Sequence, residues 1–189
     1  WDIYLYDLTK NTERRITAAP SGEFNPSVSG NLIVWDNLAS NPSTISLYDL
    51  TTNIERIIAS GETNNPRISG DKIVWVDGRH GNWDIYLYDL TKNTERRITA
   101  DPSAQANPQT SGDKIVWQDA RNGTMDIYLY DLVTDTEKQI TPVSMGYNLF
   151  PRISGNLIVW QARIDGNWDI YFYNLATDTT RRLTAAPSE

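Results

Sequence analysis

The hydrophobic and polar positions of this chain recur in a fixed order about every 42 residues. A short β-branched run that ends in tryptophan occupies residues 32–35 and returns at 72–75, 114–117 and 157–160. A run of large residues at 3–6 is followed by Asp-Leu, and its last tyrosine recurs at positions 48, 88, 130 and 173. Runs this short, bounded by glycine, asparagine and aspartate, are typical of β-strands. The constant period indicates tandem repeats.

Each repeat divides into four segments, which we designate strands A to D. Strand A, residues 25–29 in the first complete repeat, ends at a Gly-Asn or Gly-Asp pair that permits a hairpin turn into strand B, the run that ends in tryptophan. A turn-rich loop leads to strand C, which carries the recurring tyrosine, and a turn with Asn or Asp leads to strand D. Spacings within a repeat are constant, and only the link from D to the next A changes length.

This pattern predicts an all-β fold, a β-propeller of four-stranded antiparallel blades. Strand C has consecutive large residues and therefore needs cover on both faces, which a sandwich does not provide. No repeat has the helical spacing of a solenoid. We expect outer strands C and D of a partial blade at 1–22 and complete blades at 23–60, 61–101, 102–143 and 144–189. The charges of strand D fit an exposed edge protected against aggregation.

Residues 65–75, 83–90 and 96–99 together resemble the PD40, or WD40-like, repeat of TolB-type β-propellers. The resemblance covers essentially the whole chain, with local departures at Ser43, Ser46 and Thr110. It implies an interaction module of the periplasm or cell surface, hence an extracytoplasmic location. It also admits non-catalytic domains beside peptidases, and lyases, because the fold by itself names no reaction.

Composition narrows the classes of function. The 17 basic and 24 acidic side chains give a formal charge of −7, and the arginines are spread through the repeats, which disfavours nucleic-acid binding. There is no cysteine, and no apolar run approaches the roughly 18 residues of a membrane span. The chain begins at Trp1 within a repeat, so we expect a piece of a longer protein. A further segment, or self-association with a second chain, would then supply the strands that close the ring.

The acidic loops around Asp77 and Asp119 suggest two interpretations. Calcium needs six to eight oxygen ligands, whereas Arg79 and His80 stand where ligands would be required. We therefore favour Asp-Arg pairs that stabilise the turns. His80 is the only histidine and has no evident catalytic partner. The sequence predicts no enzyme, no metal site and no cofactor.

Candidate binding residues lie at the ends of strands. The tryptophans that end strand B are predicted to pack between blades. For Trp83 and Trp168, which open strand C, packing and ligand binding are equally favoured. The variable loops, 20–24, 61–64, 101–106 and 142–149, share one face, and Tyr147 and Phe150 of the last loop add aromatic surface there. On strand A, Arg67 and Arg152, with Gln109, could attract an anion to the central channel, with a solvated channel as the alternative.

These observations predict a non-catalytic interaction propeller that binds a protein or a surface polymer through its loop face. One alternative is a lectin-like propeller that stacks sugar rings on Trp83 or Trp168. A second is an enzyme-associated domain of the lyase or peptidase type. A third is a repeat-assembly polypeptide with no natural ligand, since residues 1–18 and 83–100 are identical.

Overall fold

The strands of the described residues form four antiparallel four-stranded sheets and one two-stranded sheet. The computed structural model describes residues 1–18, 22–142 and 145–185, so parts of the predicted binding loops 20–24 and 142–149, and the last four residues of the chain, lie outside the described residues. The two-stranded sheet pairs β1 (Tyr4–Asp7) with β2 (Thr12–Arg15). These are strands C and D of the repeat, without an A and B pair among the described residues. The fold is therefore all-β, as predicted.

The four complete sheets are the blades, numbered one to four along the chain. The first blade contains β3 (Glu23–Ser29), β4 (Leu32–Asn37), β5 (Ser43–Asp49) and β6 (Ile54–Gly61). The second contains β7 (Thr63–Ser69), β8 (Lys72–Asp77), β9 (Asp84–Asp89) and β10 (Thr94–Arg97). The third contains β11 (Gln105–Ser111), β12 (Lys114–Asp119), β13 (Asp126–Asp131) and β14 (Thr136–Gln139). The fourth contains β15 (Tyr147–Ser154), β16 (Leu157–Ile164), β17 (Asn167–Asn174) and β18 (Thr179–Arg182).

Turn chemistry sets the hairpins of each blade. The glycine between strands A and B has a positive φ, as at Gly70 with 58°, a conformation that glycine adopts without steric cost. The turn between strands C and D contains an Asn or Asp with positive φ, as at Asn93 with 54°, because these side chains tolerate the left-handed region. Both turns were predicted from the sequence. Their recurrence gives strands A to C the same register in every blade, whereas the pairing of β5 with β6 has an additional register shift.

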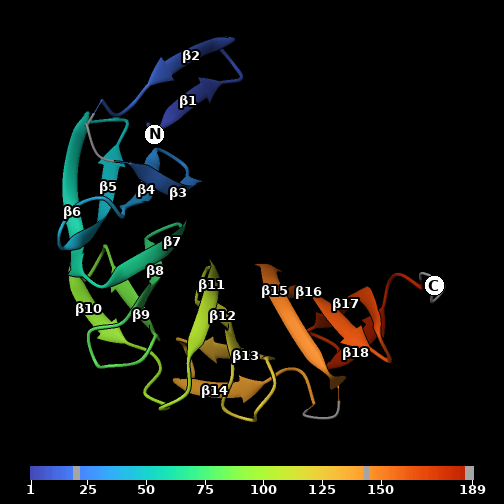
Figure 1. Cartoon of the computed structure of the whole chain (residues 1–189). Helices are drawn as coiled ribbons and strands as arrows, with labels where there is room; N and C mark the ends of the chain where they lie inside the picture. The colour runs from blue at the N-terminus through green and yellow to red at the C-terminus, as the bar shows by residue number, and fades with distance from the viewer. Residues whose placement is uncertain (19–21, 143–144, 186–189) are drawn as a thin grey trace.

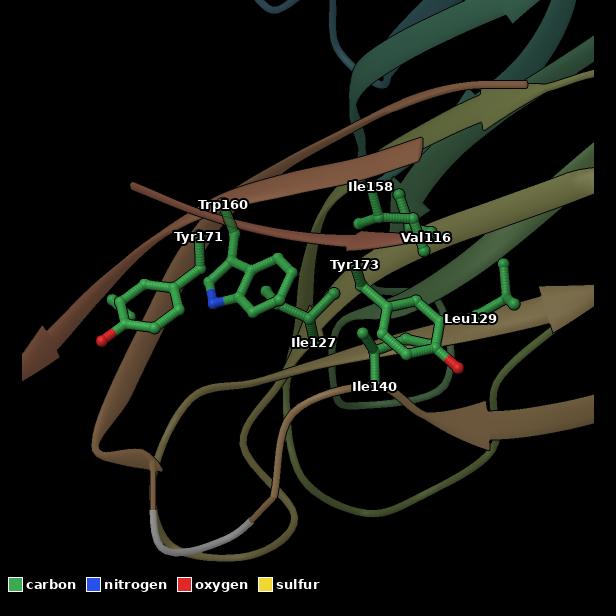
Figure 2. Close-up of a cluster of buried hydrophobic side chains, with 9 residues drawn as sticks. Val116, Ile127, Leu129, Ile140, Ile158, Trp160, Tyr171 and Tyr173 are labelled. Atoms are coloured by element: carbon green, nitrogen blue, oxygen red, sulfur yellow. The ribbon is translucent and has the colours of Figure 1, made fainter. Parts of the chain in front are cut away.

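The blades follow one another around an open arc, with strand A on the inner side and strand D on the outer side (Figure 1). The hydrophobic core lies between successive blades. In the interface of the third and fourth blades, Val116, Ile127 and Leu129 pack against Ile158 and Trp160 (Figure 2). The other blade interfaces repeat this arrangement. The tryptophans of strand B, Trp35, Trp75, Trp117 and Trp160, are all buried, which confirms that they pack between blades.

Strand C is covered on both faces only where a blade lies on each side of it. In the second and third blades, β9 and β13 are buried along nearly their whole length. By contrast, β17 alternates between buried and partly exposed residues, and β1 is largely exposed. The predicted two-sided cover therefore depends on neighbouring blades, because a blade buries strand C only by stacking against another sheet.

Candidate functional site

The loop between strands B and C is rigidly held by a buried carboxylate. Asp77 ends β8 and is fully buried, and its Oδ2 accepts a hydrogen bond from Trp75 Nε1 at 3.1 Å. Arg79 Nε donates to the other carboxylate oxygen at 2.9 Å. The same guanidinium reaches Glu95 on β10, with Nη1 to Oε1 at 2.8 Å. One arginine therefore joins the loop to β8 and to the outer strand β10.

Electrostatics favours this ion pair. Burial opposes ionisation of Asp77, but hydrogen bonds from Arg79 and Trp75 outweigh it, so the pKa of Asp77 lies below its usual range. The hydrogen bond to Asp77 likewise raises the pKa of Arg79. The third blade repeats the arrangement with Asp119 and Arg121. The Asp-Arg pairs expected for these loops are present, and in each loop the arginine donates to both oxygens of the buried carboxylate.

Trp83 follows this loop and lies between two depressions of the surface. Its side chain is 39% exposed. The first depression, of about 660 Å³, is also lined by Glu62, Gly78, Arg79 and Asn82. The second, of about 220 Å³, is lined by Val76 and by residues 104–107 among others. The indole therefore offers an aromatic wall to a ligand in either depression.

Backbone hydrogen bonds fix the position of Trp83. Gly78 N donates to Glu62 O at 2.9 Å, which holds the B–C loop beside the link that precedes strand A. Gln105 N donates to Trp83 O at 2.8 Å and joins the second blade to the third. The two kinds of loop thus lie side by side, as expected for one face of a propeller. A binding residue on such loops is positioned before any ligand arrives.

Trp168 and Tyr147 are brought together on the fourth blade. Arg163 of β16 lies opposite Tyr147 of β15 on one side and opposite Trp168 of β17 on the other, so the three side chains share one face of the sheet. Both aromatic side chains are about half exposed. Phe150 is also half exposed, but it lies beyond a register shift, and its N–H donates to Gln118 Oε1 of the third blade at 2.9 Å.

The structure does not unite the predicted aromatic residues in one site. Trp83 belongs to the second blade and Trp168 to the fourth, and Figure 1 shows β9 and β17 well apart along the arc. Trp83 has a complete blade on each side of its own, whereas the described part of the chain places no blade beyond Trp168. We therefore regard the surroundings of Trp83 as the best-defined candidate site.

Arg67 and Arg152 occupy corresponding places on the inner strands of the second and fourth blades. Arg67 Nη1 donates to Pro66 O at 2.7 Å, and Arg152 Nη1 donates to Pro151 O at 2.9 Å. Burial, followed by the charge of Arg152, lowers the pKa of Arg67. The like charge of Arg152 thus acts on Arg67 across the inner surface.

A contact between blades was missed by sequence reasoning. Arg96 of β10 donates to Tyr130 OH and forms an ion pair with Asp135 at 2.8 Å, and its guanidinium lies 5.1 Å from the centre of the tyrosine ring. Arg14 with Tyr48, and Lys138 with Tyr173, repeat this contact. The strand D charges thus have a second role beyond protecting an edge, because Arg14, Arg96 and Lys138 each join their sheet to the next one. Their signal in the sequence was a cation that precedes a tyrosine by 34 or 35 residues.

Sequence reasoning also missed a set of hydrogen bonds that join the inner strand of one blade to the next blade. Asn25 Nδ2 and Asn65 N both donate to Asp36 Oδ2, at 2.9 and 2.8 Å. Between the third and fourth blades, Asn107 Nδ2 and Phe150 N donate in the same way to one oxygen of Gln118. Each of these strand A residues has a positive φ beside a register shift. In the sequence, the only sign of these hydrogen bonds was the recurring Asn-Pro pair.

The other predicted features have simple surroundings. His80 is exposed, and its ring stacks on Tyr86 with 6.3 Å between centres. Among residues 1–18, 22–142 and 145–185, no three His, Asp or Glu side chains are grouped so that they could hold a metal ion. No helix in this part of the chain has the length and apolar character needed to cross a membrane.

Comparison with known proteins identifies the architecture. The chain aligns with the structure of TolB from Acinetobacter baumannii with a TM-score of 0.73 and 21% identity, over 96% of this chain and 48% of that one. The fold is that of TolB-type β-propellers. A putative TolB from Agrobacterium tumefaciens gives a TM-score of 0.72 and 21% identity, over 98% of this chain and 70% of that one. The chain thus spans about half the length of the first of these TolB structures.

Enzymes that contain such propellers are also similar. A puromycin-hydrolyzing peptidase from Mycobacterium tuberculosis gives a TM-score of 0.74 and 12% identity, over 90% of this chain and 30% of that one. An oligogalacturonate lyase is a further neighbour. No family model matches the sequence, and no curated protein matches it significantly. Identities this low establish the TolB-type fold and leave the activity to be argued from the site.

Proposed function

We propose that this chain is a non-catalytic binding module that takes up a segment of a partner protein beside Trp83, outside the cytoplasm. The observation that carries the proposal is the partly exposed indole of Trp83 between two depressions, on loops fixed by the Asp77–Arg79 pair and by backbone hydrogen bonds. An aromatic residue held on a rigid scaffold offers contact area at a low entropic cost and is enriched among residues that dominate binding.

The surroundings of Trp83 suit a peptide. The second depression has apolar side chains, including Val76 and Ala104, that fit an apolar side chain of the partner. The first has Glu62 and Asn82, which can pair with backbone or polar groups. The similarity to TolB propellers supports a role in protein interaction and an extracytoplasmic location.

A displayed library of random peptides tests the proposal. Peptides selected on the wild-type chain are measured against Trp83→Ala and against Met125→Ala, which changes the corresponding position of the next repeat. We expect the selected peptides to bind Trp83→Ala at least about tenfold more weakly, the usual loss at a dominant aromatic contact. Met125→Ala should retain the wild-type affinity.

Two results would contradict the proposal. Selected peptides that bind Trp83→Ala as tightly as the wild type would place the contact elsewhere. A glycan array in which sugars, but no peptides, require Trp83 would favour the lectin alternative. Circular dichroism of both variants must first match the wild type, so that lost binding reports the site and not the fold.

A further inference from the structure

Three polar side chains stand at one level on neighbouring inner strands. Arg67 of β7 lies opposite Val74, Gln109 of β11 opposite Val116, and Arg152 of β15 opposite Val159. Each follows an X-Pro pair and a register shift, so the local backbone has the same form at all three positions. β11 lies against both β7 and β15, and Figure 1 shows these strands on the inner side of the arc. The repeat therefore directs the three residues to the same inner surface.

Neither arginine forms an ion pair within the part of the chain that the structure describes. Within the described residues, no ion pair includes Arg67 or Arg152, although the protein carries a formal charge of −7. Other arginines, such as Arg79 and Arg121, form ion pairs with two carboxylates each at 2.8 Å or less. Arg67 and Arg152 use one N–H on the preceding proline carbonyl, and Arg67 adds a long contact of 3.5 Å to Asn25 O. Most of their five donors remain available.

Gln109 adds a donor between them. Its Nε2 is buried and has no hydrogen-bond partner in the described structure. A buried N–H group without a partner is costly, and an anion that accepts a hydrogen bond from it would remove that cost. The repulsion between the two guanidinium groups would be relieved by the same anion.

The charge of the ligand is limited by a neighbouring acid. Asp36 is buried, and its charge acts on Arg67. Two arginines and this acid together leave one net positive charge, which a singly charged ligand neutralises. A carboxylate carries one charge and has two oxygens that match the fork of an arginine.

We propose that Arg67, Gln109 and Arg152 form a binding site for a carboxylate, presented by an acidic side chain or by the C-terminus of a peptide that enters the inner surface. The site is separate from Trp83, so it does not depend on the function proposed above. It would give the inner surface a specificity for carboxylates.

The test is an NMR titration of the ¹⁵N-labelled chain, observed at the arginine Nε–Hε signals. The probe is the N-acetyl amide of glutamic acid, and its neutral control is the corresponding glutamine compound. We expect the signals of Arg67 and Arg152 to shift with the acidic probe and not with the neutral one. Arg67→Gln and Arg152→Gln should each weaken binding by about tenfold, because charge-assisted hydrogen bonds are lost.

Further variants separate the site from general charge effects. Arg181→Gln removes an exposed arginine from the outer strand β18 and should leave the affinity unchanged. Arg67→Lys keeps the charge without the fork and should bind the acidic probe more weakly than the wild type. Equal responses to both probes, or equal losses in Arg67→Gln and Arg181→Gln, would overturn the proposal. Tighter binding of inorganic phosphate than of the acidic probe would overturn the assignment to a carboxylate.

Discussion

Trp117 Nε1 donates a hydrogen bond of 2.9 Å to Asp119 Oδ2, and both residues are fully buried. Asp119 also accepts a hydrogen bond from Arg121 Nε at 2.9 Å. Replacing this carboxylate leaves a buried indole N–H and a guanidinium without their acceptor. We expect Asp119→Ala to lower the free energy of unfolding by about 3 kcal/mol, the lower end for a broken buried pair. Urea unfolding followed by fluorescence measures the change.

The control for this prediction is Asp113→Ala, in an exposed hairpin turn of the same blade. Its effect should stay within about 0.5 kcal/mol, as for most surface changes. If the two variants lost equal stability, the B–C loop would not be held by the buried carboxylate. Asp119→Ala combined with Arg121→Ala should cost less than the sum of the single changes, because the two residues form one network.

A second prediction concerns the buried carboxyl group of Asp36. Burial raises its pKa, and hydrogen bonds from Asn25 and Asn65 offset this only in part. Because the folded-state pKa lies above the unfolded one, the stability that this group contributes is fully present at low pH and is lost as pH rises through the folded-state pKa. Asn at this position does not titrate. We expect the stability of Asp36→Asn relative to wild type to increase from pH 4 to pH 7.

The hydrogen bonds around Asp36 also permit its replacement by asparagine. Both donors bind the same oxygen of Asp36, and the other oxygen is buried without a partner. Between the third and fourth blades, Gln118 accepts the two corresponding hydrogen bonds with a single amide oxygen. Asp36→Asn should therefore be more stable than the wild type at pH 7, as measured by urea unfolding over this pH range. Asp113→Asn, at an exposed position, is the control. If the stability of Asp36→Asn relative to the wild type varied with pH no more than that of Asp113→Asn, the raised pKa would be contradicted.

A third prediction uses the two identical segments of the chain. Tyr86 is 3% exposed and its ring lies tilted against that of Trp75 with 5.7 Å between centres, whereas Tyr4, in the same local sequence, is 55% exposed. Tyr86→Ala should lower the free energy of unfolding by about 3–5 kcal/mol, as for other large buried aromatic residues. Tyr4→Ala should cost under about 1 kcal/mol. Equal losses in thermal or urea unfolding would show that local sequence, and not burial between blades, sets the cost.

Much of the candidate site could be foreseen from the sequence. The tryptophans that end strand B recur in every complete repeat, and burial between blades requires that constancy. The position of Trp83 is filled by Met125 or Ser43 in other repeats, which indicated that packing alone does not determine it. Its partly exposed indole agrees with that expectation. The two depressions beside it could not be predicted, because their walls come from loops of two successive repeats.

The sequence alone determined the repeat, its four strands and their turns, since these depend on residues close together in the chain. It could not determine which copies of a repeated segment are buried. Residues 1–18 and 83–100 have the same sequence, yet β1 is largely exposed and β9 is buried on both faces. Burial of strand C requires apolar surface from the adjacent blades, and that contact exists only in the tertiary structure. The sequence placed Arg67, Gln109 and Arg152 on strand A, and the packing of β11 against β7 and β15 is what brings these strands together.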